Sequence, residues 1–116
     1  MSGVQREMEN LLALDGEIMG VHETSGHWVK IEARRVKPTA ERPYGVRYSL
    51  TLHDHTNRRV LGYDNAHGTP KRRVPFDHKH RHQNDEGVPY KFQSAERLLE
   101  DFWNDVDRVL RQFDHS

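Results

Sequence analysis

The strongest constraint on the fold is the regular alternation of apolar and polar residues over positions 46–53. The apolar residues at every second position are Val46, Tyr48, Leu50 and Leu52. A period of two places successive side chains on opposite faces of a β-strand, so the segment predicts a strand with one buried face. Arg47 and His53 then lie on the opposite, more open face.

Strand patterns also occur at residues 17–24, 27–36 and 59–65. A hairpin connection at 54–57 joins two of the four segments, and a loop with two prolines at 37–43 precedes the clearest one. Short connections usually join antiparallel neighbours. The four segments therefore predict a four-stranded antiparallel meander.

A wide apolar stripe over residues 98–113 predicts a long C-terminal helix that packs on the sheet. Ser94 is a suitable N-cap for it, and Glu96 falls in the first turn, where the helix dipole favours an anion. Apolar residues at helical spacing over 4–12 predict a short N-terminal helix. We expect a single α+β domain over residues 1–116, with an antiparallel sheet of about four to five strands packed against the long C-terminal helix.

Composition limits the classes of function. The chain contains no cysteine, which excludes disulfides, thiolate zinc sites and cysteine nucleophiles. No apolar run approaches the roughly 20 residues of a membrane span, and the N-terminus lacks the apolar stretch of a signal peptide. We therefore expect a cytoplasmic protein with no membrane partner.

The charge is zero in total but unevenly distributed. Residues 58–82 contain seven Lys or Arg against two acids, whereas residues 93–107 contain five acids against one Arg. A neutral protein with this pattern either presents a local basic surface to a polyanion or neutralises the two regions across the fold. Both interpretations stay open on the sequence.

Histidine is the residue that most directly indicates chemistry. Six of the nine histidines lie between His53 and His82, interspersed with arginine, lysine and aspartate. Histidine exchanges protons near neutral pH, and arginine and lysine bind phosphate. For proton transfer we select His53, His67, His78 and His80, with Asp64 and Asp77 to orient them. For phosphate binding we select Arg47, Arg59, Lys79 and Arg81. Solvated surface histidines are the alternative.

The strand alternation directs some of these side chains toward each other. The hairpin at 54–57 brings Asp64 beside the strand that ends at His53, and an aspartate near a histidine fixes its tautomer. The alternative is that Asp64 and Asn65 cap the turn after the strand. Residues 68–89 are polar, so we expect a functional or disordered connection there, whose histidines are exposed.

The histidines are compatible with two kinds of enzyme. The alternating histidines of 78–82 point in diverging directions. A zinc or manganese site that combines His78 or His80 with His53, His67 or Asp77 is therefore the less favoured alternative. Metal-independent RNA cleavage needs a base for the 2′-hydroxyl, an acid for the 5′-oxygen and cations at the phosphorus. We favour this reaction, with no metal and no cofactor. Tyr44, Tyr63 and Tyr90 are either base-stacking or packing residues.

Several segments together resemble the TumE-like family of bacterial and archaeal toxins. The segments are 11–17, 27–30, 42–54, 62–67, 76–82 and 98–103. The most specific are Tyr-Asp-Asn-Ala-His at 63–67 and Phe-Asp-His-Lys-His-Arg-His at 76–82. The resemblance implies an intracellular toxin encoded beside an antitoxin, usually a helix-turn-helix protein, and it specifies no reaction. We therefore expect a toxin that acts on RNA. The alternatives are a metal-dependent nuclease or phosphotransferase, and a non-enzymatic module that binds nucleic acid or protein.

Overall fold

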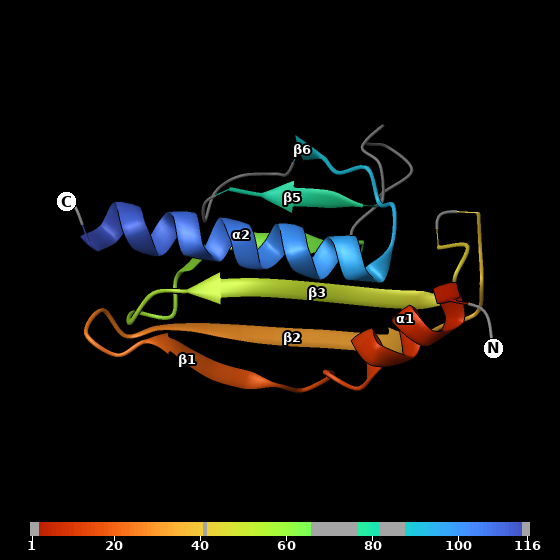
Figure 1. Cartoon of the computed structure of the whole chain (residues 1–116), viewed down its shortest axis with the longest axis horizontal. Helices are drawn as coiled ribbons and strands as arrows, with labels where there is room; N and C mark the ends of the chain where they lie inside the picture. The colour runs from red at the N-terminus through yellow and green to blue at the C-terminus, as the bar shows by residue number, and fades with distance from the viewer. Residues whose placement is uncertain (1–2, 41, 66–76, 82–87, 115–116) are drawn as a thin grey trace.

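A six-stranded antiparallel sheet, with its strands in chain order, forms the centre of the computed structural model (Figure 1). The structure describes residues 3–40, 42–65, 77–81 and 88–114. The elements are α1 (Gly3–Leu12), β1 (Ile18–His22), β2 (His27–Arg35), β3 (Val46–His53), β4 (Arg59–Asp64), β5 (His78–His80), β6 (Val88–Pro89) and α2 (Ala95–Asp114). The predicted α+β class, with both helices and the meander β1 to β4, is confirmed.

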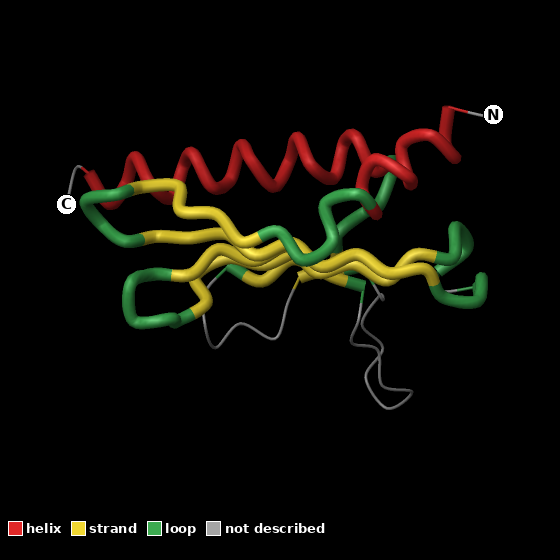
Figure 2. The backbone as a smooth tube through the Cα atoms, turned by 90° about the horizontal axis from the view of Figure 1, so that it is seen from below, coloured by secondary structure: helices red, strands yellow, loops and turns green. Residues whose placement is uncertain are grey.

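Both helices lie on one face of the sheet (Figure 2). Burial of alternating strand residues drives this arrangement, because β2 and β3 each turn their apolar side chains toward the helices. The fully buried members of this core include Val29, Ile31, Tyr48, Leu50, Leu52, Leu61, Leu98 and Phe102. Within the described residues the other face of the sheet carries no helix, and the side chains of β2 and β3 on it are mostly polar.

The long helix α2 begins where the sequence predicts. The Ser94 hydroxyl accepts a hydrogen bond of 3.0 Å from the Arg97 backbone N–H, which satisfies one of the unpaired donors of the first turn. Leu98, Phe102 and Val106 follow at intervals of four residues and are all buried. At about 1.5 Å per residue this helix extends about 30 Å across the sheet. None of the described helices is long and apolar enough to cross a membrane.

The connection after β4 contributes more structure than the sequence indicates. Residues 78–80 pair with β4, and residues 88–89 pair with β5. The sheet thus has five strands of three or more residues and a sixth of two residues. A three-residue His-Lys-His strand contains no apolar residue, so its pairing depends on the backbone edge that β4 offers and not on a hydrophobic pattern.

Candidate functional site

The helix-free face of the sheet brings together polar residues from four strands. Strand register aligns Lys30, Thr51, Gly62 and His80 in one row across β2, β3, β4 and β5. A neighbouring row contains Ser49 and Asp64, and His53 with its partner Arg59 lies on the other side. We call these aligned side chains the open face.

A buried histidine–aspartate pair lies at the β4–β5 end of the open face. Nε2 of His80 is 3.0 Å from Oδ2 of Asp64, and each side chain is only 7% exposed. A carboxylate in this position fixes the orientation of the imidazole. The sequence predicted an exposed His80. It is buried because β5 pairs with β4 and turns this side chain toward Asp64.

Arg59 extends along the open face above a glycine. A Cβ atom added to Gly62 would lie 3.3 Å from Cδ and 3.8 Å from Nη1 of Arg59. The absence of a side chain at Gly62 therefore makes room for the guanidinium between Thr51 and His80 in the row. A positive charge is thus held close to the histidine–aspartate pair.

A bulge in β4 explains the direction of Arg59. Leu52 pairs with Leu61 while His53 pairs with Arg59, so Val60 is one extra residue in β4. An extra residue interrupts the strict alternation of side chains and re-aims its neighbours. Without the bulge, alternation from the buried Leu61 would direct Arg59 toward the helices.

His53 occupies the adjacent row and is held by two contacts. Its Nε2 lies 2.9 Å from the Thr51 hydroxyl, and its ring stacks on Trp28 with centroids 4.2 Å apart. Within the described part of the chain, the buried Nδ1 of His53 makes no hydrogen bond. Burial lowers the pKa of His53, the Asn57 backbone opposes this shift, and the positive charges of Lys30 and Arg59 act in the same direction as burial. The neutral form, which accepts a proton, is therefore favoured.

His53 and His80 are on the same face but on strands two apart. Sheet dimensions of about 4.8 Å between strands and about 3.3 Å per residue place their Cα atoms about 12 Å apart. The His53 ring stacks on Trp28 of β2, and Nε2 of His80 faces Asp64. Arg59 lies over Gly62 of β4, the strand between the two histidines.

Two of the selected residues lie on the helix-covered side of the sheet. The Tyr48 hydroxyl donates a hydrogen bond of 2.7 Å to Oδ2 of Asp77. Nζ of Lys79 is 2.6 Å from Oδ2 of Asp105 in α2. The structure therefore does not bring Asp77 and Lys79 to His80, because alternation along β5 directs neighbouring side chains to opposite faces.

Four of the residues selected from the sequence remain: two are exposed arginines, and two are histidines that the structure does not describe completely. Arg47 is exposed on the open face beside its register partner Arg34, and Arg81 is exposed directly after β5. His67 lies outside the described residues. His78 lies in β5 opposite Asp64, and its side chain is outside the described part of the chain.

The tyrosines and Asn65 have structural roles. The hydroxyls of Tyr63 and Tyr90 donate to Asp105 and Asp101 of α2, so these rings pack beneath the helix. Asn65 is buried, accepting from the Tyr48 N–H at 2.9 Å and donating to the Val46 carbonyl at 2.8 Å. Packing, the alternative considered for the tyrosines, fits the contacts of Tyr63 and Tyr90, whereas the side chain of Asn65 binds the backbone of β3.

Sequence reasoning did not select Trp28 and Lys30 on β2 for the site. Trp28 stacks on His53, and Lys30 lies in the row of Thr51 and His80. The alternation along β2 already assigned Lys30 to the polar face, but the pairing of β2 with β3 was needed to place it near the histidines. Among the described residues, no group of three or more His, Asp or Glu side chains is arranged to hold a metal ion.

Fold and site define an α+β domain with a histidine–aspartate pair and an arginine on one open sheet face. A family model described as "Toxin TumE" matches residues 10–110, which is most of the chain. The chain belongs to the TumE toxin family, as the sequence resemblance predicted. It is therefore a toxin of a toxin–antitoxin system, and the family implies a cognate antitoxin as partner. Comparisons with curated proteins and with solved structures found no match.

Proposed function

We propose that this toxin acts on RNA as a metal-independent endoribonuclease whose site is the open face. The observation that carries the proposal is the His80–Asp64 contact of 3.0 Å, with Arg59 beside it over Gly62 and a neutral-favouring His53 in the next row. Two histidines with different surroundings supply an acid and a base, and the arginine supplies a cation for phosphate.

The reaction follows from these positions. His53 takes the proton of a ribose 2′-hydroxyl, and the 2′-oxygen forms a bond to the adjacent phosphorus. The bond from phosphorus to the 5′-oxygen breaks, and protonated His80 donates its proton to that oxygen. The Asp64 carboxylate orients the His80 ring through its contact with Nε2. Arg59 stabilises the negative charge that accumulates on the phosphate oxygens.

The charge of the open face supports RNA as the substrate. Lys30, Arg34 and Arg47 share this face with Arg59. The acids on it are Asp64 and Glu32, and Glu32 pairs with Lys30 at 2.9 Å. Clustered cations attract a polyanion and release its counterions on binding. Phosphate contacts of this kind fix the strand while the histidines act on one linkage.

RNA cleavage by purified protein in excess chelator tests the proposal. We expect cleavage by the wild type, and losses of roughly a hundredfold to ten-thousandfold for His53→Ala and His80→Ala. Arg59→Ala, which removes no core side chain, should also lower the rate. The matched control is His55→Ala, because His55 is exposed in the turn between β3 and β4.

Two outcomes of this assay contradict the proposal. Cleavage that disappears in chelator and returns with zinc or manganese supports a metal-dependent nuclease. RNA binding without cleavage, by protein shown to be folded, supports a non-enzymatic binding module.

A further inference from the structure

One edge of the sheet is unoccupied in the described structure. β1 pairs with β2 on one side, and the strand order places no strand on its other side (Figure 1). The opposite edge, β6, is two residues long, whereas β1 has five. β1 therefore offers the longer backbone edge to a partner.

The register identifies which backbone groups of β1 face outward. The Ile31 N–H donates to the Glu17 carbonyl at 2.9 Å, and the Ile31 carbonyl accepts from the Gly16 N–H at 2.9 Å, so the Glu17 carbonyl points toward β2. Hydrogen-bonded and non-bonded pairs alternate in an antiparallel ladder. The N–H and C=O groups of Ile18 and Gly20 consequently point away from β2, in the direction from which another strand would pair.

The edge lacks most of the usual protection against pairing. Natural edge strands carry lysine, proline or inward-pointing charges that oppose a new neighbour. β1 contains no Lys, Arg, Asp, Glu or Pro, and its Ile18 side chain is 62% exposed. A β-bulge, which is itself a feature that opposes edge pairing, lies near the end of β1, between Gly20 and His22.

Charge identifies the partner. Glu17 and Glu23 flank β1, and residues 7–29 contain five acids with no Lys or Arg. A second copy paired antiparallel about Gly20 would set Glu17 against Glu23, and like charges directly opposite each other are destabilising. Nucleic acid is repelled for the same reason. A strand with basic residues at its ends meets the opposite charge at both ends of β1.

We propose that the antitoxin adds an extended, basic segment to the outer edge of β1 as an additional strand. Main-chain hydrogen bonds from Ile18 and Gly20 would supply affinity, and Glu17 and Glu23 would select the basic segment. The proposal rests on the toxin–antitoxin role and not on RNA cleavage. A docked partner would lie next to β1, which separates it from Trp28 and Lys30 of β2.

Gly20→Pro and Gly20→Ala form a matched pair for the test. No atom lies within 4 Å of a Cβ added to Gly20, so the Cβ atom that both substitutions introduce has room. Proline removes the outward N–H, whereas alanine keeps it. Calorimetric titration of purified toxin with purified antitoxin should show binding weakened about tenfold or more by Gly20→Pro, and nearly unchanged by Gly20→Ala.

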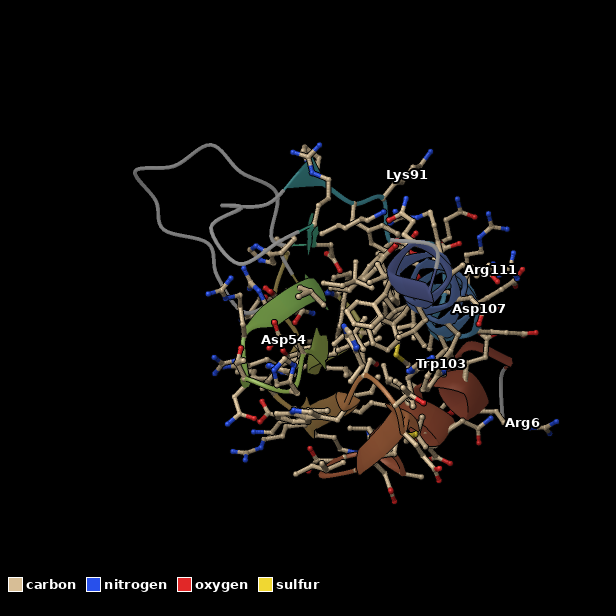
Figure 3. The ribbon with its side chains drawn as sticks, turned by 90° about the vertical axis from the view of Figure 1, so that its left-hand side faces the viewer. Arg6, Asp54, Lys91, Trp103, Asp107 and Arg111 are labelled. Atoms are coloured by element: carbon tan, nitrogen blue, oxygen red, sulfur yellow. The ribbon has the colours of Figure 1, made fainter. Side chains whose placement is uncertain are left out.

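A charge-reversal pair tests the chemistry of the partner. The double variant Glu17→Lys and Glu23→Lys should weaken antitoxin binding, while Asp107→Lys should not. Asp107 lies on the outer side of α2 and is 68% exposed (Figure 3). Both sets are checked by thermal unfolding, and should Gly20→Pro unfold the protein, the double charge variant carries the test.

The results separate this proposal from the enzymatic one. Variants that lose antitoxin binding should retain whatever RNA cleavage and growth arrest the wild type shows. Wild-type affinity in Gly20→Pro, or in the double charge variant, overturns the proposal. A concentration-dependent dimer in the absence of antitoxin, abolished by Gly20→Pro in sedimentation experiments, also overturns it because the edge then serves a second copy.

Discussion

At the scale of single residues, the contact between His80 and Asp64 contributes both to the stability of the fold and to the proposed reaction. Both residues are about 5% exposed, so neither has water to replace its partner. A buried polar group that loses its partner retains the full cost of desolvation. The same histidine that donates a proton in the proposed reaction is therefore also needed for stability.

Replacement of His80 by alanine should lower the free energy of unfolding by about 1–3 kcal/mol, because Asp64 is left buried without this partner. His55→Ala, in an exposed turn, should change it by no more than about 0.5 kcal/mol. Urea denaturation of the three proteins provides the comparison. Equal stability of His80→Ala and wild type would mean that the 3.0 Å contact contributes nothing to the fold.

At the scale of elements, the β1–β2 hairpin is joined to the end of α2 through a histidine. Nδ1 of His27 lies 2.6 Å from the Ser25 hydroxyl, and its ring meets that of Phe113 edge-on at 5.2 Å. Burial lowers the pKa of His27 below its ordinary value of 6.5, although Asp54 acts in the opposite direction. The folded state therefore takes up this proton at lower pH than the unfolded chain does.

The free energy of unfolding should consequently fall as the pH drops below about 6.5. In that range the unfolded chain binds a proton at position 27 and the folded protein does not, so the contribution is complete above 6.5 and is lost toward the lower folded pKa. The pKa of His53 is also lowered, so His53 adds to the dependence of stability on pH with the same sign. Denaturation at several pH values should show a smaller slope for His27→Gln; an unchanged slope would contradict the account.

The sequence predicts those elements in which the pattern of apolar residues is long enough to distinguish a strand from a helix. Eight alternating residues define β3, and the stripe from Leu98 onward with its Ser94 cap defines α2. The three residues of β5 contain no apolar side chain, so nothing in their pattern indicates a strand. The bulge at Val60 and the separation of Asp77 from His80 depend on how strands pair. The sequence identifies the histidines as candidates, but it does not give their burial or the residues that they contact.

At the scale of the whole molecule, a formal net charge of zero conceals two surfaces of opposite sign. The open face carries Lys30, Arg34, Arg47 and Arg59, whereas acids flank β1. A polyanion and a basic protein segment are thus directed to different surfaces. The acidic helix α2 binds Lys79 through Asp105, so part of the basic segment is neutralised within the fold.

The chemical nature of the RNA ends tests the central claim most directly. Fragments produced by the purified toxin in excess chelator would be analysed by mass spectrometry. Attack by the 2′-hydroxyl, with His53 as base and His80 as acid, predicts a 2′,3′-cyclic phosphate on one fragment and a 5′-hydroxyl on the other. Fragments with 5′-phosphate ends would contradict the account, because a water molecule or a metal-bound hydroxide would then be the nucleophile in place of the ribose.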